Sequence, residues 1–282
     1  MRNNIQTVGH PVGKMHRFHR RAERLWPNVV DSNPTMTGVV VTASATPHAV
    51  GAWTELIAST SGPVDWLQIH AVGTFTSATD TSSLVDIGIG PAGSETIIAS
   101  SLPSGFREPL SAAGLIPTPA MFPVTIPKGT RISCRAQALI ASDTVTVYTE
   151  TYFQGLRCGS VVDTYGANTA SSRGTNMPTS NTYVELTAAT TQPYQALVVL
   201  PAMGGSNSTA GASVTYTLGA GPAAAETTLL TVGVRSSIGE SVTMESRPVA
   251  IYSGHVPAGT RLAGKQSVGV NYRDMIVLGI RY

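Results

Sequence analysis

The sequence predicts an all-β protein with two tandem, internally duplicated β-sandwich domains, jelly-roll-like or immunoglobulin-like, after a basic N-terminal arm with a short helix. Three observations predict this class. Strand-like stretches recur from residue 28 onward, and clusters of Gly, Pro, Ser and Asn separate them at intervals of roughly ten residues. Several short motifs also occur twice in the same order. Such spacing is typical of sandwiches and barrels.

The composition fits a packed β-protein with few salt bridges. The 282 residues suit one large domain or two of ordinary size. A hydrophobic fraction of 42% allows a packed core, whereas charged residues make up only 12%, about half of the usual share. A surface built from Ser and Thr instead is common in extracellular and virion β-proteins and less common in cytoplasmic enzymes.

The predicted arm comprises residues 1–28 and holds the basic character of the chain. Residues 1–30 carry six basic side chains and one acidic one, a balance of +5. The remainder carries 12 basic and 15 acidic side chains, a balance of −3, which gives the net charge of +2. Because the body of the protein is not basic, we expect no nucleic-acid partner.

Within the arm, residues 15–26 predict a short helix, because apolar residues at 3-4-3 spacing form one stripe and Pro27 follows. Aromatic and arginine side chains are typical anchors of protein interfaces. We therefore expect the arm to dock on a neighbouring subunit. The predicted docking residues are Arg17, Phe18, Arg20, Arg21, Arg24, Leu25 and Trp26.

After Pro27 the sequence signals are those of strands, and we expect no helix of two turns or more. Alternating or β-branched apolar stretches predict strands in 66–77, 144–153, 212–218, 247–254 and 274–280. Two longer tracts rich in Gly, Pro, Ser and Ala, 100–123 and 202–212, are predicted to be surface loops.

Five segments occur twice in the same order, which predicts an internal duplication. The pairs are NVVD (28–31) and SVVD (160–163), WTEL (53–56) and YVEL (183–186), GIGPAGSE (88–95) and GAGPAAAE (219–226), IPKGTR (126–131) and VPAGTR (256–261), and YTETYFQGLR (148–157) and YRDMIVLGIR (272–281). We therefore expect domain 1 at 29–158, a linker with the opening loop of the second repeat at 159–181, and domain 2 at 182–282.

The repeated glycine and proline motifs indicate turns. In IPKGTR, Pro suits the second position and Gly the fourth position of a type I turn that leads into a strand. GIGPAGSE resembles a phosphate-binding loop in its glycines. However, no helix and no GK[ST] follow it, and Pro occupies a position that should donate an N–H. We interpret this segment as a bulge or turn.

The acidic residues shared by the two copies are interpreted as structural. A glycosidase needs two carboxylates in one site, whereas the pairs Glu55/Glu185 and Glu95/Glu226 occupy matching places in two domains. We expect these carboxylates to bond loop N–H groups or to pair with the arginines of the two repeated turns, Arg131 and Arg261.

We predict no catalytic, metal or cofactor site. His16 and His19 are spaced as a metal pair, but they lack a third ligand nearby and four arginines surround them. Cys134 and Cys158 do not have CxxC spacing, so we interpret them as buried free thiols. No apolar run reaches the roughly 18 residues that span a bilayer, and no signal peptide is evident, so we expect no membrane partner.

In its basic arm and its Ser/Thr/Gly/Ala-rich β-domains with IPxGTR-like turns, the chain resembles the structural proteins of tailed-bacteriophage virions. The resemblance concerns the general design of the whole chain. It implies a non-enzymatic virion protein that assembles as a homotrimer or ring. Such a protein would decorate the capsid as a cement protein or sit at the neck or tail, with major capsid, neck or tail proteins as partners.

The alternative is a receptor- or carbohydrate-binding tail or fibre protein, with or without glycan-hydrolase activity. A host glycan would then be the partner, stacked on Trp53, Trp66, Tyr183 or Tyr194. Against this, Trp53 and Tyr183 occupy equivalent positions of the two repeats, which favours an interpretation as core aromatics.

Overall fold

The computed structural model describes residues 28–32, 38–73, 81–107, 118–153, 161–167, 174–178, 181–202, 213–235, 250–267 and 274–281. Within these ranges the chain forms strands, turns and bends without a helix, which confirms the predicted all-β class. None of the described residues belongs to a helix that could cross a membrane. The predicted helix at 15–26 lies outside the described residues.

The first half of the chain folds into two sheets with the strand order of an eight-stranded jelly roll. Its strands are β1 (Asn28–Ser32), β2 (Val39–Thr42), β3 (Thr54–Ile57), β4 (Val64–Gly73), β5 (Thr81–Ile89), β6 (Thr96–Arg107), β7 (Thr118–Ile126), β8 (Ile132–Ala138) and β9 (Thr144–Phe153). One sheet has the order β1-β9-β4-β7, and the other contains β3-β8-β5-β6. Strands β1 and β2 pair with successive parts of β9, so together they take the place of one of the eight jelly-roll strands.

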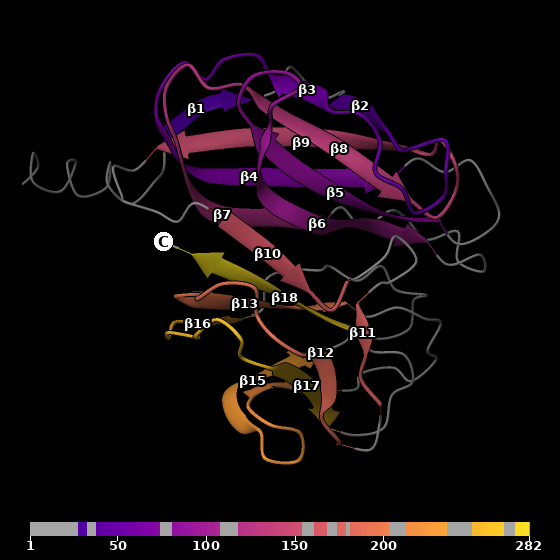
Figure 1. The fold of residues 1–282 in the computed structure, drawn as a ribbon, viewed down its shortest axis with the longest axis vertical. Helices are drawn as coiled ribbons and strands as arrows, with labels where there is room; N and C mark the ends of the chain where they lie inside the picture. The colour runs from indigo at the N-terminus through magenta and orange to yellow at the C-terminus, as the bar shows by residue number, and fades with distance from the viewer. Residues whose placement is uncertain are drawn as a thin grey trace, which may run out of the picture.

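The second half repeats this topology strand for strand, and its strands lie below those of the first half in Figure 1. Its strands are β10 (Val161–Tyr165), β11 (Thr175–Asn176), β12 (Val184–Thr187), β13 (Ala196–Ala202), β14 (Ser213–Ala220), β15 (Thr227–Arg235), β16 (Ala250–Tyr252), β17 (Leu262–Ser267) and β18 (Asp274–Arg281). The orders are β10-β18-β13-β16, with β11 on β18, and β12-β17-β14-β15. The predicted duplication is thus confirmed, and of the two predicted sandwich types the structure has the jelly roll.

Strand register confirms four of the five sequence matches and corrects the fifth. Asp31 pairs with Thr151 on β9, and its counterpart Asp163 pairs with Gly279 on β18. The offset between β9 and β18 is therefore 128 residues, since 279 − 151 = 128. The match between 148–157 and 272–281 assumed an offset of 124, so its shared Tyr, Gly and Arg are not equivalent. Sheet pairing sets the register, and short sequence identity does not.

The two jelly rolls share one sheet rather than being connected only by a linker. Strand β6 of the first unit pairs in parallel with β10 of the second, where Val162 lies opposite Ala99. The Thr164 hydroxyl also donates to the Ser100 carbonyl oxygen at 2.6 Å. A nine-stranded sheet therefore runs through both units. Strands β10 and β11 both lie in the segment 159–181 that we interpreted as linker and opening loop.

The central strands of this shared sheet are buried on both faces. On β18, Ile276 and Leu278 belong to the core cluster of the first unit, whereas Met275 and Val277 belong to that of the second. A strand buried on both faces has no polar face to alternate with. This explains why residues 275–280, within the predicted strand 274–280, form a continuous apolar run in the sequence.

The prediction of a surface loop at 100–123 was wrong, because β6 extends through Arg107 and β7 begins at Thr118. The prolines that suggested a loop lie where a sheet tolerates them. Pro119 and Pro123 are in β7, an edge strand, and Pro103 is in β6 beyond its pairing with β10. A missing N–H costs no ladder hydrogen bond on an outward edge. In the tract 202–212, only Ala202 is described, and it ends β13.

Candidate functional site

Each jelly roll carries the same arginine bridge at the start of its eighth strand. In the first unit, Arg131 Nε donates to Glu55 at 2.9 Å and its Nη1 donates to Glu95 at 2.8 Å. The Glu95 side chain is buried, whereas Glu55 is half exposed. The predicted pairing of these carboxylates with the turn arginine is confirmed.

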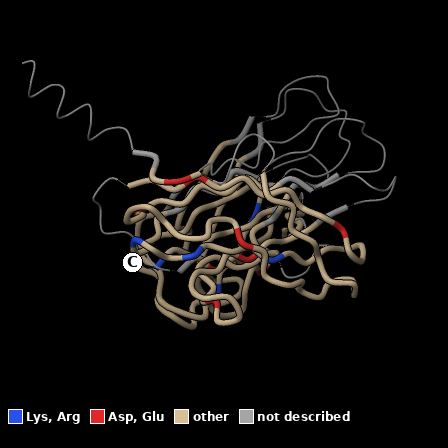
Figure 2. The backbone as a smooth tube through the Cα atoms, turned by 90° about the horizontal axis from the view of Figure 1, so that it is seen from above, with Lys and Arg blue, Asp and Glu red and all other residues tan. Residues whose placement is uncertain are grey.

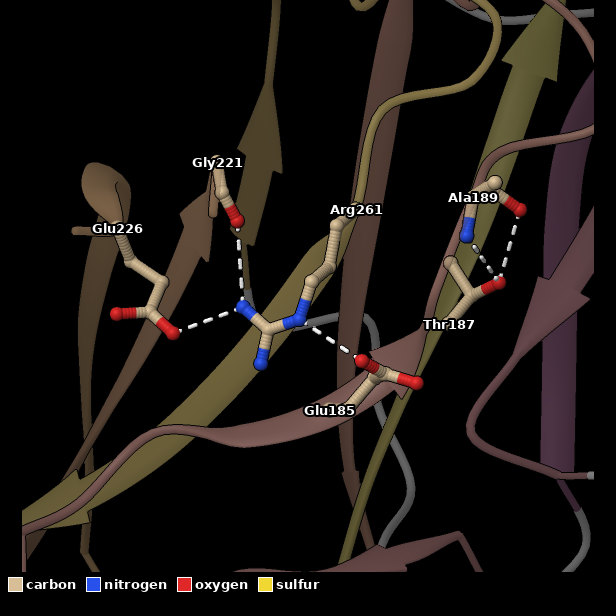
Figure 3. Close-up of polar contacts among 6 residues, drawn as sticks. All are labelled: Glu185, Thr187, Ala189, Gly221, Glu226 and Arg261. Atoms are coloured by element: carbon tan, nitrogen blue, oxygen red, sulfur yellow. Dashed lines mark hydrogen bonds and ion pairs between the residues drawn. The ribbon is translucent and has the colours of Figure 1, made fainter. Parts of the chain in front are cut away.

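The second unit repeats the bridge in the same geometry (Figure 3). Arg261 Nε donates to Glu185 at 2.8 Å, and its Nη1 donates to Glu226 at 2.8 Å and to the Gly221 carbonyl oxygen at 3.2 Å. One guanidinium therefore joins β12, β17 and the loop between β14 and β15. The planar guanidinium group presents several N–H donors, so one arginine can bind two carboxylates and a carbonyl oxygen at once.

These contacts keep the two inner carboxylates ionised. Desolvation acts to raise the pKa of Glu95, but the hydrogen bond and charge of Arg131 and nearby backbone N–H groups outweigh it and lower this pKa. The hydrogen bond from Arg261 likewise lowers the pKa of Glu226. A general acid needs a raised pKa at neutral pH. Both carboxylates are therefore tuned for ion pairing and not for proton donation.

The repeated turn is held by a buried threonine in each unit. Thr60 Oγ1 donates to the Pro127 carbonyl oxygen at 2.9 Å and accepts from the Thr130 N–H at 3.1 Å. Its backbone bonds Gly129 and Thr130 at 2.8 and 2.9 Å. Thr190 makes the same four contacts to the second turn, at 2.8, 3.1, 2.8 and 2.8 Å. The PxGT motif that the two copies share thus corresponds to one hydrogen-bonded turn in each unit.

The turn itself differs from the predicted type I. Its two central residues are Lys128 and Gly129, so Gly129 is in the third position rather than the fourth. Gly129 and its counterpart Gly259 have φ of +82° and +79°. A positive φ at the third position is what a type II turn requires of glycine. In GIGPAGSE the turn interpretation is confirmed, because the Ser94 N–H donates to the Pro91 carbonyl oxygen at 3.0 Å.

A second repeated cluster places an aromatic ring against a glycine and under a cation. In the first unit, the Arg135 guanidinium lies 4.7 Å from the centre of the Trp53 ring, and the same Arg135 donates to Asp86 at 2.8 Å. A Cβ on Gly88 would lie 2.7 Å from the indole, so this position has no room for a side chain.

The second unit uses Tyr183, Gly219 and Lys265 at the equivalent positions. The Lys265 ammonium lies 4.5 Å from the centre of the Tyr183 ring, and a Cβ on Gly219 would lie 2.7 Å from that ring. Both rings are half-buried on the outer face of the sheet, so they are repeat-equivalent as predicted but are not core residues. Their neighbours already occupy part of the ring surface that a sugar would stack on.

The other two candidate stacking residues occupy different environments. Tyr194 is fully buried and cannot present its ring to a ligand. Its hydroxyl donates to the Asp163 carboxylate and lies 2.6 Å from the Tyr165 hydroxyl. Burial, together with the hydrogen bond to Asp163, raises the pKa of Tyr194. Trp66 is half-buried, with its indole nitrogen away from any described hydrogen-bond partner.

Sequence reasoning did not detect the network of Asp163, Tyr165, Thr191 and Tyr194. The only sequence signal was the repeated VVD, because the network assembles side chains from β10 and from the turn before β13. The predicted docking residues Arg17, Phe18, Arg20, Arg21, Arg24, Leu25 and Trp26 lie outside the described residues, as do His16, His19 and Cys158. Cys134 is a buried free thiol, as predicted, and burial raises its pKa, with Asp86 adding to the effect.

Charged positions are sparse along the described backbone (Figure 2). Most of the charged residues that recur in both units make the arginine bridges, whereas Asp31 and Asp163 accept hydrogen bonds from uncharged groups. Arg135 and Lys265 cover the rings of Trp53 and Tyr183. Among the described residues, no group of three or more His, Cys, Asp or Glu side chains could hold a metal ion.

Comparisons with known proteins give distant structural similarity only. No family model and no curated protein matches the sequence. The chain is similar to PNGF-II, with a TM-score of 0.44, 11% identity, and coverage of 99% of this chain and 70% of that one. It is also similar to the tandem CBM22-1–CBM22-2 domain of Paenibacillus barcinonensis Xyn10C, with a TM-score of 0.26, 8% identity, and coverage of 90% and 98%. For tripeptidyl peptidase 2 the TM-score is 0.21 at 9% identity, over 90% of this chain and 24% of that one.

Proposed function

We propose that the chain is a non-enzymatic structural protein of a virion, of the tailed-phage kind, that assembles as a symmetric homo-oligomer on the capsid surface or at the neck or tail. The observation that carries this proposal is the tandem jelly roll joined edge to edge through β6 and β10. Jelly rolls are a common architecture of viral capsid proteins. Two equivalent units per chain would let a trimer present six similar domains.

The use of charge in the two units supports the same proposal. The carboxylates that could serve as acids or bases in both copies, Glu95 and Glu226, are bound by Arg131 and Arg261 and have lowered pKa values. These ion pairs connect strands and loops of one unit. They stabilise a scaffold, which is the role expected of a shell component.

The partners in this proposal are further copies of the chain and a major capsid, neck or tail protein. The basic arm at 1–28 is the segment that we propose contacts them. It directly precedes β1, the first strand of the shared framework. Side chains in the arm would then reach a neighbouring subunit at the place where the jelly roll begins.

The experiment that tests this function measures the mass of the purified chain and its binding to particles. We expect a mass of several times 29.3 kDa and co-sedimentation with virus particles that lack the protein. Deletion of residues 1–27 should abolish co-sedimentation while the β-sheet signal in circular dichroism stays unchanged. A stable monomer without affinity for particles would contradict the proposal, and specific binding on a glycan array would favour the carbohydrate-binding alternative.

A further inference from the structure

Strand β15 of the second unit is the counterpart of β6 in the first. Gly219 pairs with Thr228 on β15 as Gly88 pairs with Ile97 on β6, which fixes the equivalence of the two strands. In the first unit, β6 is covered by β10. Among the described strands, β15 pairs only with β14, so it ends its sheet. Strand β15 therefore offers, at the end of its sheet, the same strand edge that β10 covers on β6.

The apolar side chains of β15 are more exposed than their counterparts on β6, as expected for a strand without a neighbour on one side. Ile98 and Ala99 on β6 are 3% and 0% exposed. Their counterparts on β15, Leu229 and Leu230, pack against the second core but are only half-buried. The apolar side chains of β15 thus keep surface that a further strand would remove from water.

The complementary edge lies at the other end of the chain. Strand β1 is the counterpart of β10, and among the described strands it pairs only with β9. It differs from β10 in a bulge at Val30, whose carbonyl oxygen accepts from the Ser61 hydroxyl at 3.2 Å. Val162 on β10 is 1% exposed, whereas the aligned Val30 on β1 is half-buried. Among the described strands, each chain therefore has one further equivalent of each strand in its internal β6–β10 joint. Strand β15 corresponds to β6, and strand β1 corresponds to β10.

Strand β15 also lacks the protection that the other sheet ends carry. Edge strand β7 contains Pro119 and Pro123, and edge strands β3, β12 and β16 are three or four residues long. Strand β15 has nine residues, TTLLTVGVR, with no proline and no charge before Arg235. Long uncharged edges are templates for pairing with another chain unless they are blocked.

We propose that β15 of one chain pairs in parallel with β1 of a second copy, reproducing between chains the β6–β10 joint within the chain. Val30 then lies opposite Leu230, and the Ser32 hydroxyl donates to the Thr231 carbonyl oxygen, as Thr164 donates to Ser100. The interface is head-to-tail, so repetition gives a closed ring or an open filament.

This inference deepens the proposed function, and it rests on that function in requiring self-assembly. The test uses the full chain and two blocking variants. Thr231→Lys places a charge on the exposed face of β15, and Ser32→Lys does the same on β1, because edge lysines oppose strand pairing. Thr125→Lys, at an exposed threonine of the other edge strand β7, is the matched control. Circular dichroism and the unfolding midpoint verify that each variant is folded.

Sedimentation velocity at micromolar concentration gives the decisive readout. We expect assemblies for the wild type and for Thr125→Lys, and a mass of 29.3 kDa for each blocked variant alone. A mixture of Thr231→Lys and Ser32→Lys should give dimers and nothing larger, because one intact β15 meets one intact β1. A folded Thr231→Lys or Ser32→Lys chain that still assembles, or a mixture that stays monomeric, would overturn the interface.

The outcomes also separate this interface from the proposed function. If the wild type assembles and the blocked variants assemble equally, the β15–β1 joint is wrong while the structural role stands. If the wild type remains a monomer and does not bind particles, both are wrong.

Discussion

The two jelly rolls share one framework but fill it differently. In the first unit, Val64 on β4 and Thr151 on β9 are both buried, and Thr151 Oγ1 accepts from the Asp31 N–H at 2.9 Å. In the second unit, the equivalent positions hold Tyr194, which pairs with Val256 as Val64 pairs with Ile126, and Gly279, which pairs with Asp163 as Thr151 pairs with Asp31. A small residue on the last strand is thus matched by a large one beside it. The comparison shows that topology and repeated polar joints are kept while core volume is exchanged between neighbours.

The conserved aspartate at the start of each unit illustrates the same exchange. The Asp31 carboxylate accepts from the Ser61 N–H at 2.8 Å. The Asp163 carboxylate instead accepts from the side chains of Thr191, Gln192 and Tyr194. Both aspartates are only half-buried, and each accepts hydrogen bonds from the segment that follows its unit's third strand. The two units therefore use different donors for the same aspartate position.

The largest loss of stability should come from placing a residue type of the first core at the equivalent position of the second core. A Cβ on Gly279 would lie 2.7 Å from the Tyr194 ring. Gly279→Thr should therefore destabilise the protein by about 3 kcal/mol, the upper part of the range for overpacked cores. Chemical unfolding monitored by tyrosine fluorescence and circular dichroism measures this loss.

The double variant Gly279→Thr with Tyr194→Val, which transplants the pair of the first unit, serves as the control. We expect it to be more stable than Gly279→Thr alone, because the added volume is removed at the site of the clash, but less stable than the wild type, because the Tyr194 hydroxyl no longer donates to Asp163. A double variant that is less stable than either single variant would show that the two positions do not exchange volume.

A smaller effect is expected at the two buried threonines. Thr60→Val removes the hydrogen bonds of Thr60 Oγ1 to the Pro127 carbonyl oxygen and the Thr130 N–H. Thr190→Val removes the same two bonds in the second unit, where the Pro257 carbonyl oxygen keeps the Thr260 hydroxyl as a donor at 2.7 Å. Each substitution should cost about 1 kcal/mol, the typical net contribution of a hydrogen bond. Thr42→Val, at an exposed position of β2, should change stability little. A loss at either threonine that is no larger than the loss for Thr42→Val in thermal unfolding would contradict the role of the buried threonine in holding the turn.

The smallest expected effect is a dependence of folding stability on pH. The pKa of Glu95 and of Glu226 is lower in the folded chain than in the unfolded chain, where a glutamate has a pKa of about 4.3. Their stabilisation is therefore present above that pH and is lost as the pH falls through the folded pKa.

Arg131→Met should consequently lower the unfolding midpoint more at pH 7 than at pH 3. Lys128→Met, at an exposed position of the same turn, is the matched control and should show no such dependence. A loss for Arg131→Met that is the same at both pH values would refute the role of the ion pair.

The sequence allowed the fold class, the duplication and the arginine bridges to be predicted, because Pro-Gly turns and buried ion pairs need particular residues at fixed positions. It did not allow the strand register at 148–157 or the strands within 100–123 to be predicted. Register depends on pairing partners far along the chain, and the prolines at 103, 119 and 123 indicate loops unless the edge position of their strands is known. The Asp163–Tyr194 network was missed for a similar reason, since only the fold brings its members together.

The measurement that tests the central claim most directly is an image of the assembled protein, by electron cryomicroscopy, at a resolution that separates strands. We predict that β1 of each chain continues the sheet of a neighbouring chain in parallel to β15, so that similar jelly rolls follow one another at a repeated joint. An assembly in which both β15 and β1 face solvent would contradict the account.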